Sequence, residues 1–295
     1  MKIKTSIILI ASSMFASAMF GAAPSFEQLQ ANAAKGDAEA EFLVGKAYAK
    51  GDGTTQDFSK AAEYYRKAAE QGNAKAQNNL GLLYQQGNGV QKDEKEAAAW
   101  FRKAAGQGAA LAQDSLGLIL RDGKGVSKDC REAATWFEKA ANQGNIDAEV
   151  HLAQLYFFGD DDFPRNYDNA AIWIKKAADH NRVWAWNALG NLYENGFGIK
   201  QDKHEATLWY QKAAETGNAK AQGNIGRCYG SGVGVNKNPT LAYMWLKLGQ
   251  NQGEATALNY LKEFVLTLTK EQIAEGEKLV EDYRSGKIPP LTTGT

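Results

Sequence analysis

The sequence predicts an all-α fold: a right-handed α-solenoid of about six 36-residue helix-loop-helix repeats, with capping helices at its N- and C-terminal ends. The first observation is a repeat, because the chain from residue 36 onward divides into blocks that begin at Gly36, Gly72, Gly108, Gly144, Asn181 and Gly217. Five blocks have 36 residues and the fourth has 37. The second observation is that each block holds two amphipathic helical patterns. Since one such hairpin cannot bury both apolar faces alone, the hairpins are expected to stack.

The first half of each block predicts one helix. Counting the block's first residue as position 1, position 5 is alanine in all six blocks, and positions 9 and 13 are aliphatic or tyrosine. Spacing of i, i+4 and i+8 places these side chains in one stripe. A glycine that suits a left-handed C-terminal cap follows in every block: Gly51, Gly87, Gly123, Gly159, Gly196 and Gly232.

The second half of each block predicts the partner helix. It opens on a good N-cap residue, namely Asp57, Asp93, Asp129, Asn166, Asp202 or Asn238. An aromatic pair such as Trp100-Phe101 follows, and five blocks then close on Lys-Ala-Ala. That lysine lies in the last helical turn, where the helix dipole favours a cation.

A glycine interrupts the apolar face of the first helix at position 10. It is Gly45, Gly81, Gly117, Gly190 or Gly226, and only the fourth block has alanine, Ala153. Five such glycines cost about 4 to 5 kcal/mol of helix propensity in total. We expect a compensating gain, in which the small residue forms a notch that admits a bulky aromatic side chain of a neighbouring helix.

The two ends differ from the repeats. Residues 1–23 have Lys2 and Lys4 before an apolar run and small residues, which is the pattern of a secretory signal peptide, and an uncleaved N-terminal membrane anchor is the alternative. Ala18 and Ala23 are both suited to cleavage, so the cleavage site stays open. Residues 24–35 predict an N-terminal capping helix, 36–252 the six repeats, 253–284 a half repeat and a C-terminal capping helix, and 285–295 a flexible tail. We therefore expect an exported protein, periplasmic or secreted, without stable membrane insertion of the mature chain.

The charge balance argues against nucleic acid as a partner. The chain has 34 basic and 34 acidic residues, so it has no overall positive field to attract a polyanion.

The repeated residues resemble a known family. Ala, Leu-Gly, Tyr, Gly-x-Gly-Val and Ala-x-x-Trp-Phe-x-Lys-Ala-Ala together are similar to the Sel1-like repeat (SLR) family, a relative of tetratricopeptide arrays, over about residues 36–280. This resemblance implies an adaptor that binds other proteins, in exported bacterial forms often with a role at the cell envelope or toward a host. Some cysteine-rich relatives are described as penicillin-binding or β-lactamase-like, so a cell-wall or β-lactam hydrolase is the alternative function.

The motifs of enzyme chemistry are missing from the sequence. No serine has a lysine three residues later, and neither Ser-Asp-Asn nor Lys-Thr-Gly occurs, so serine acylation is not expected. The Gly-x-Gly steps follow a helix and lack the Lys-Ser or Lys-Thr of a phosphate-binding loop. The three histidines share no helix face, which disfavours a zinc site. We therefore predict no enzyme activity, no catalytic residue, no cofactor and no metal.

Two cysteines and one acidic loop leave smaller questions. Cys228 takes the place of apolar core residues in other blocks, whereas Cys130 stands at the start of a second helix, where exposure and an intermolecular disulfide are conceivable. The two lie about three repeats apart, too far for a disulfide between them. The loop 159–164, with three consecutive aspartates, holds the extra residue of block four, and we interpret it as a solvated variant loop in preference to a weak calcium site.

A partner-binding groove is expected on the concave face lined by the first helices. Registering the repeat on its tetratricopeptide relative assigns positions 4, 7, 11 and 14 to this groove, and these positions vary while the packing positions repeat. The predicted groove residues are Lys75, Asn78, Leu82, Gln85, Leu111, Asp114, Leu118, Arg121, Asp147, Gln154, Phe157, Trp184, Asn187, Asn191, Lys220 and Arg227. Mixed apolar, amide and charged groups suit a protein or peptide, and Phe157 and Trp184 are the candidate anchors.

Overall fold

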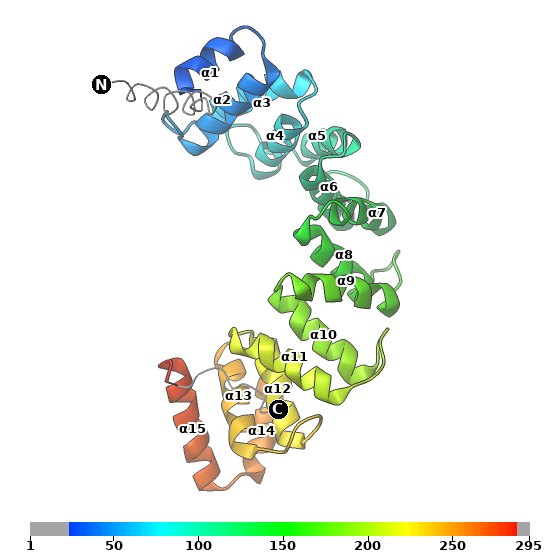
Figure 1. Ribbon diagram of the computed structural model, residues 1–295, viewed down its shortest axis with the longest axis vertical. Coiled ribbons are helices and arrows are strands. Elements are labelled where there is room, and N and C mark those ends of the chain that lie inside the picture. The colour runs from blue at the N-terminus through cyan, green and yellow to red at the C-terminus, as the bar shows by residue number, and fades with distance from the viewer. Residues whose placement is uncertain (1–23, 288–295) are drawn as a thin grey trace, which may run out of the picture. The chain divides into compact units, whose positions relative to one another are not determined.

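The computed structural model describes residues 24–287 of the chain, so the predicted signal peptide and most of the predicted tail lie outside the described residues. Within them the fold is all-α, with fifteen α-helices, one 3₁₀ helix and no strand longer than the isolated bridge between Asp160 and Phe163 (Figure 1). The predicted fold class is confirmed. The chain divides into two compact units, Met1–Gln107 (unit 1) and Gly108–Thr295 (unit 2).

Unit 1 holds the first two repeats. Its helices are α1 (Phe26–Ala33), α2 (Ala38–Lys50), α3 (Phe58–Glu70), α4 (Ala74–Gln86) and α5 (Glu94–Gly106). α2 pairs with α3 and α4 with α5, while α1 packs on α2 and α3 packs on α4. Its core contains the predicted stripe residues, among them Val44 and Leu80, together with Tyr65 of the second helix.

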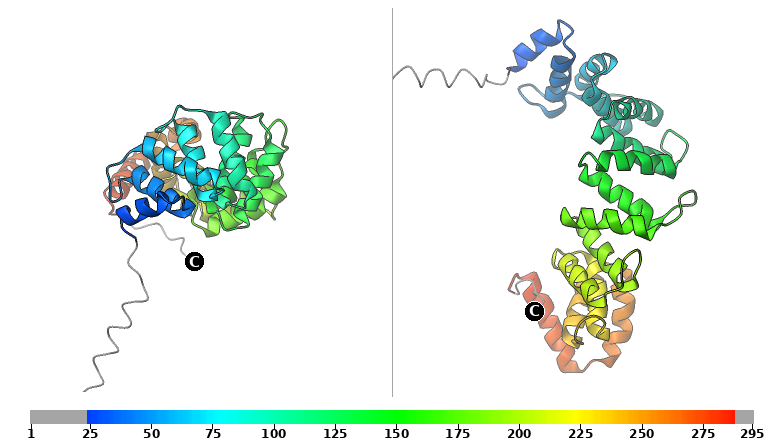
Figure 2. Two further views of the ribbon diagram at one scale, coloured as in Figure 1. Left: turned by 90° about the horizontal axis from the view of Figure 1, so that it is seen from above. Right: turned by 45° about the vertical axis from the view of Figure 1, so that its right-hand side comes forward.

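Unit 2 holds the other four repeats and the C-terminal helices. Its elements are α6 (Ala110–Asp122), α7 (Cys130–Ala141), α8 (Ile146–Phe158), α9 (Tyr167–Asp179), α10 (Val183–Asn195), α11 (Lys203–Glu215), α12 (Ala219–Ser231), α13 (Pro239–Asn251), α14 (Ala255–Phe264), η1 (Val265–Thr267) and α15 (Lys270–Arg284). Each first helix pairs with the following second helix, and each second helix packs on the next first helix (Figure 2). Stacking therefore buries the apolar faces that a single hairpin leaves open.

The local signals act as expected at the helix ends. All six predicted N-cap side chains accept a hydrogen bond from a backbone N–H of the first turn. The cap glycines Gly51, Gly87, Gly123, Gly196 and Gly232 take the left-handed conformation. Gly159, in the repeat with the extra residue, has φ 67° and ψ −175° instead, so that loop takes a different course.

The position-10 glycines are packing notches, as predicted, and the bulky partner comes from the second helix of the same repeat. A Cβ atom on Gly81 would lie 2.8 Å from Cε1 of Phe101, and one on Gly117 would lie 2.5 Å from Cε1 of Phe137. Tyr65, Tyr210 and Leu246 fill the notches of Gly45, Gly190 and Gly226. Opposite the exception, Ala153, the equivalent second-helix residue is Ile174. The one alanine thus faces an aliphatic residue, but Gly226 also faces an aliphatic residue, Leu246, so the expected aromatic partner is present at four of the five glycines.

Each Gly-x-Gly loop connects the two helices of one repeat and packs against the preceding repeat. The second glycine of a loop lies against the first residue of the preceding repeat's second helix: Gly89 against Phe58, Gly198 against Tyr167, and Gly234 against Lys203. A Cβ atom at any of these glycines would overlap the backbone carbonyl of that residue. The glycine is therefore required by a close approach of two backbones, in addition to its positive φ.

A polar relay, made of hydrogen-bonded side chains, crosses the interior at the end of the hairpins opposite the Gly-x-Gly loops. Side chains that follow the second helix donate to position 6 of the first helix: Gln71 to Glu41, Gln107 to Gln77, Gln143 to Gln113 and Gln252 to Gln222, at 2.7 to 2.9 Å. His180 and Glu149 form the equivalent pair, 2.8 Å apart. Gln77 and Gln222 in turn donate to backbone carbonyls of the preceding repeat, Ala69 and Ala214. The relay satisfies polar groups that stacking buries.

The final helix packs on the second helix of the last repeat. α15 contacts α13, and α14 contacts α12 and α13. Tyr283 donates to the carbonyl of Glu215 at 3.0 Å, and its ring lies 5.3 Å from the ring of Trp245. Gly276 faces the ring of Tyr243, whose hydroxyl donates to Glu277 at 2.5 Å. α15 therefore covers an apolar face of α13 that would otherwise be open.

Candidate functional site

The first-helix face is the surface formed by positions 4, 7, 11 and 14 of the first helices in each unit. Of the predicted groove residues, four are exposed: Lys75, Leu111, Asp147 and Lys220. Nine are half-buried: Leu82, Gln85, Leu118, Arg121, Gln154, Phe157, Trp184, Asn191 and Arg227. Side chains of these two groups are open to a ligand, and whether they bind one stays a prediction.

The remaining three predicted groove residues, all at position 7, are buried. Asn78 is 6% exposed, and Asp114 and Asn187 are each 9% exposed. Asp114 Oδ1 lies 2.7 Å from Nδ1 of His151 in the next repeat, and Asn187 accepts from Asn224 Nδ2 at 2.9 Å. Asp114 and Asn187 therefore join neighbouring first helices, and they offer little surface for direct contact with a partner.

A half-buried ion pair occupies part of the face in unit 2. Arg227 donates to both carboxylate oxygens of Glu194 at 2.7 Å, and Tyr210 donates to the same carboxylate at 2.8 Å. Burial acts to lower the pKa of Arg227, but its hydrogen bonds to Glu194 and the charge of that carboxylate outweigh burial and raise it. Burial and the nearby Glu194 charge raise the pKa of Tyr210. The predicted contact residue Arg227 is thus already paired with an acid.

Two other charged residues of the face, Asp147 and Arg121, are paired with opposite charges. Asp147 accepts from Arg182 at 2.6 Å, and Arg121 contacts Asp122 at 2.8 Å. Lys75 places its ammonium 5.8 Å from the ring centre of Phe42. Ion pairing of this kind leaves fewer charged groups of the face available to a partner.

An aromatic strip lies in unit 2, formed by Phe157, Phe158, Tyr167, Trp184 and Phe197. Phe157 is in ring contact with three of the others, with centroids 5.0 Å from Phe158, 5.9 Å from Tyr167 and 6.3 Å from Trp184. Tyr167 stacks on Phe197 at 4.4 Å. Phe158 is 51% exposed and Phe197 36% exposed. The two predicted anchors are therefore neighbours, and the structure adds three aromatic residues that the helical spacing did not place beside them.

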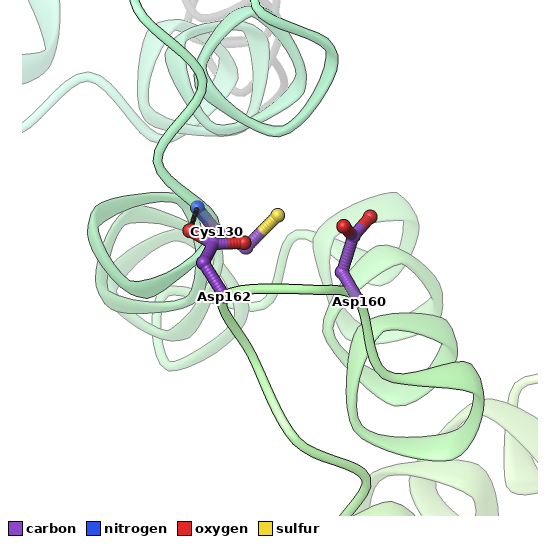
Figure 3. Close-up of side chains that lie close together, drawn as sticks. All are labelled: Cys130, Asp160 and Asp162. Atoms are coloured by element: carbon purple, nitrogen blue, oxygen red, sulfur yellow. Dashed lines mark hydrogen bonds between the residues drawn. The ribbon is translucent and has the colours of Figure 1, made fainter.

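A second cluster surrounds Cys130 at the start of α7. Its Sγ atom and one carboxylate oxygen each from Asp160 and Asp162 lie within 4.8 Å of one another (Figure 3). The Cys130 N–H donates to Asp162 Oδ2 at 3.1 Å, and Lys128 pairs with Asp160 at 2.5 Å. In this repeat the aspartate loop therefore holds the position that a Gly-x-Gly loop holds elsewhere, against the start of the preceding second helix.

The Cys130 side chain is fully buried, which corrects the expectation that it is exposed. The loop that carries Asp162 covers the first turn of α7, a contact that the sequence spacing did not reveal. Burial raises the pKa of the Cys130 thiol to about 12, with further contributions from its hydrogen bond to Asp162 and the charges of Asp162 and Asp160. The thiol is thus protonated at neutral pH in the folded protein.

Both cysteines are expected to be unreactive in the folded protein. Burial raises the pKa of the Cys228 thiol to about 11, and both side chains are buried. Since the thiolate is the nucleophile, a chromogenic disulfide reagent at pH 8 should detect no thiol until denaturant is added, and then two. Rapid reaction of one thiol without denaturant would show that the Cys130 loop opens.

An open cavity of about 470 Å³ lies in unit 1, lined by Arg66, Tyr84, Val90, Gln91, Lys92, Asp93 and Glu96. Arg66 donates to the hydroxyl of Tyr84, and Lys92 pairs with Glu94 at 3.2 Å. Gln211 and Tyr229 are hydrogen-bonded at equivalent positions in unit 2. The Arg66 contact is therefore a recurrent link between repeats.

Among residues 24–287, no helix is long and apolar enough to cross a membrane.

Comparison with protein families gives one match, the Sel1 repeat. It covers residues 38–73, 74–108, 110–145, 146–181, 187–218 and 219–253, which together are most of the chain. The matched segments follow the six structural repeats. None of the curated proteins matches the chain.

Three solved structures to which the chain is similar are described next. A Sel1 repeat protein from Oxalobacter formigenes is 30% identical, with a TM-score of 0.66, over 82% of this chain and 94% of that one. The protective antigen c5321 of uropathogenic Escherichia coli, which displays an SLR fold, is 26% identical over 92% of this chain and 75% of that one, with a TM-score of 0.41. Helicobacter pylori cysteine rich protein B is 27% identical over 45% of this chain and 100% of that one, with a TM-score of 0.37.

Proposed function

The chain belongs to the Sel1 repeat family, and we propose that it is an exported, non-enzymatic scaffold that binds a protein or peptide on its first-helix face. Sel1 repeat proteins are generally non-catalytic scaffolds for protein interaction. The observation that carries the proposal is the aromatic strip, which combines the two predicted anchors with exposed Phe158 and Phe197. Exposed aromatic groups on a rigid stack are favourable anchors for a partner.

Export is the second part of the proposal. It is supported by the basic start, apolar run and small residues of positions 1–23, which lie outside the described residues. Periplasmic and secreted locations are both compatible with this pattern. The hydrolase alternative is not proposed, because the sequence lacks the serine, lysine and asparagine motifs of acylation chemistry.

Site-specific crosslinking in cells tests the binding face, and an intact-mass measurement tests export. A photoreactive amino acid at Gln154 or Asn191, half-buried on the first-helix face, should crosslink to a defined partner. The same amino acid at Ile172, which is exposed on the second helix α9, is the matched control and should not. Equal crosslinking from both faces would contradict the assigned face.

Export is tested by the intact mass of the protein from the periplasmic or culture fraction. That mass should correspond to the chain without its signal peptide, and a full-length cytoplasmic product would contradict export.

A further inference from the structure

The cavity of unit 1 is lined by four charged residues, two of which are already engaged. It is the open cavity of about 470 Å³, and its charged residues are Arg66, Lys92, Asp93 and Glu96. Lys92 pairs with Glu94 at 3.2 Å. The Asp93 carboxylate accepts two backbone N–H groups in the first turn of α5, so it caps that helix. None of the residues that line the cavity belongs to the predicted groove on the first-helix face.

Arg66 and Glu96 carry charges that no opposite charge compensates. Neither side chain forms an ion pair with any of residues 24–287, and they do not pair with each other although both line the cavity. Arg66 is half-buried and donates to the neutral hydroxyl of Tyr84. Its guanidinium lies 5.6 Å from the Tyr84 ring centre and keeps further N–H donors. Glu96 is exposed in the first turn of α5. The cavity therefore presents one positive and one negative charge, each without an ionic partner.

The link between repeats does not require the charge of Arg66. In unit 2 the equivalent residue is Gln211, which accepts from the hydroxyl of Tyr229 at 3.3 Å. A neutral side chain thus joins the same two positions of neighbouring repeats. Stacking explains a polar group at position 66, but it does not explain a cation there.

We propose that the cavity of unit 1 binds a small zwitterion, in which an ammonium and a carboxylate are joined by a short uncharged body. This is the chemistry of a free amino acid or a dipeptide. Arg66 binds the carboxylate, because a guanidinium presents paired N–H donors that match its two oxygens. Glu96 binds the ammonium. The site is additional to the first-helix face and does not depend on the scaffold function.

The presence of both signs of charge favours a zwitterion over a simple ion. An anion attracted to Arg66 would be repelled by Glu96 and Asp93, and a cation attracted to Glu96 would be repelled by Arg66 and Lys92. A zwitterion meets an opposite charge at both of its ends.

The size and the remaining lining of the cavity suit a small molecule. A volume of about 470 Å³ lies within the range of small-molecule sites, whereas a folded partner needs a much larger surface. Val90 and the ring of Tyr84 are half-buried and supply apolar lining for the body of the ligand. Gln91 supplies an amide that can donate to or accept from a peptide group.

The test titrates the mature protein with leucine and with alanyl-leucine, and follows its backbone amide signals by NMR. Saturable shifts are expected in the segment 84–96, and the tighter of the two ligands identifies the source of the zwitterion. N-acetyl-alanyl-leucine lacks the ammonium and alanyl-leucine amide lacks the carboxylate. Each should bind about tenfold more weakly than the free dipeptide, because each loses one charge-assisted interaction.

Two variants assign the two charges. Arg66→Gln should bind the free dipeptide about tenfold more weakly and no longer distinguish it from its amide. Glu96→Gln should lose the distinction between the free and the acetylated dipeptide instead. Arg66→Gln should unfold at the same temperature as the parent protein, because Gln211 makes the equivalent link. Lys95→Gln and Glu70→Gln, at exposed residues that do not line the cavity, are the matched controls and should bind as the parent does.

Three results would overturn the inference. They are the absence of saturable shifts with both free ligands, equal affinity for the free and the blocked dipeptides, and equal losses in the cavity and control variants. Inorganic phosphate is the remaining probe. Phosphate that binds as tightly as the dipeptide would make the cavity a site for simple anions and would also overturn the inference.

Discussion

Gly81→Leu is expected to destabilise the folded protein by about 3 kcal/mol, at the upper end of the range for overpacked cores. The substituted side chain begins 2.8 Å from Cε1 of Phe101, a ring that is fully buried and held between two helices. Leucine gains somewhat less than 1 kcal/mol of helix propensity over glycine, which is too little to offset this overlap. The midpoint of urea unfolding should fall accordingly.

A double-mutant cycle separates the notch from a general effect of substitution. Gly81→Ala alone should be destabilising in spite of its better helix propensity, because its Cβ atom meets Phe101. Phe101→Ile alone should also be destabilising, since it leaves a cavity. The two changes together recreate the Ala153 and Ile174 pair of the fourth repeat and should cost at least about 1 kcal/mol less than their sum. Additive costs, or an unchanged unfolding midpoint for Gly81→Leu, would contradict the packing notch.

Gly234→Ala is expected to destabilise the protein by about 3 kcal/mol and to separate two neighbouring repeats of unit 2. Gly234 has a φ of 73°, which costs a residue with a side chain roughly 1 to 2 kcal/mol. Its Cβ atom would also overlap the carbonyl oxygen of Lys203 and approach the side chain of Thr207 at 2.9 Å. Two backbone segments must then move apart, and the loop loses its contact with α11.

Gly217→Ala is the matched control for this second prediction. Gly217 has a similar φ of 88°, but a Cβ atom there would have no neighbour within 4 Å. It should therefore show the conformational cost alone, roughly 1 to 2 kcal/mol. Hydrogen exchange should report the difference locally, with lost protection near the start of α11 and in the 232–237 loop for Gly234→Ala only. Equal destabilisation by both variants would show that backbone conformation, and not contact between repeats, requires the glycine at position 234.

The sequence was sufficient for the fold because its information is local and repeated. Helix ends depend on single residues such as Asp57 and Gly51, which act within a few positions along the chain. The stripe of alanine, leucine and tyrosine identifies the buried face, and six copies reduce the effect of any exception. The position-10 glycine was also interpretable, because a propensity cost that recurs five times indicates a gain that recurs with it.

The candidate site was predictable only in part. Phe157 and Trp184 are recognisable in the sequence as large aromatic residues at positions predicted to face a groove, and they do lie together. Phe158, Tyr167 and Phe197 were not placed beside them, because they fall at a helix end, a helix start and a loop. For Phe158 and Phe197 the sequence carries a signal, because no other repeat has an aromatic residue at these positions, whereas the first repeat has Phe58 where the fourth has Tyr167.

The sequence by itself thus determined the all-α repeat, the helix boundaries, the packing notches and the absence of recognised enzyme motifs. Only the tertiary structure decided which of the predicted groove residues are already buried or paired within the chain. Asp114, Asn187 and Arg227 are joined to residues 33 to 37 positions away in the next or preceding repeat. Cys130 is buried by a loop that follows it by about 32 positions. Position along one helix fixes a side chain's direction, but its burial and its charge partner depend on the neighbouring repeat, which helical periodicity does not encode.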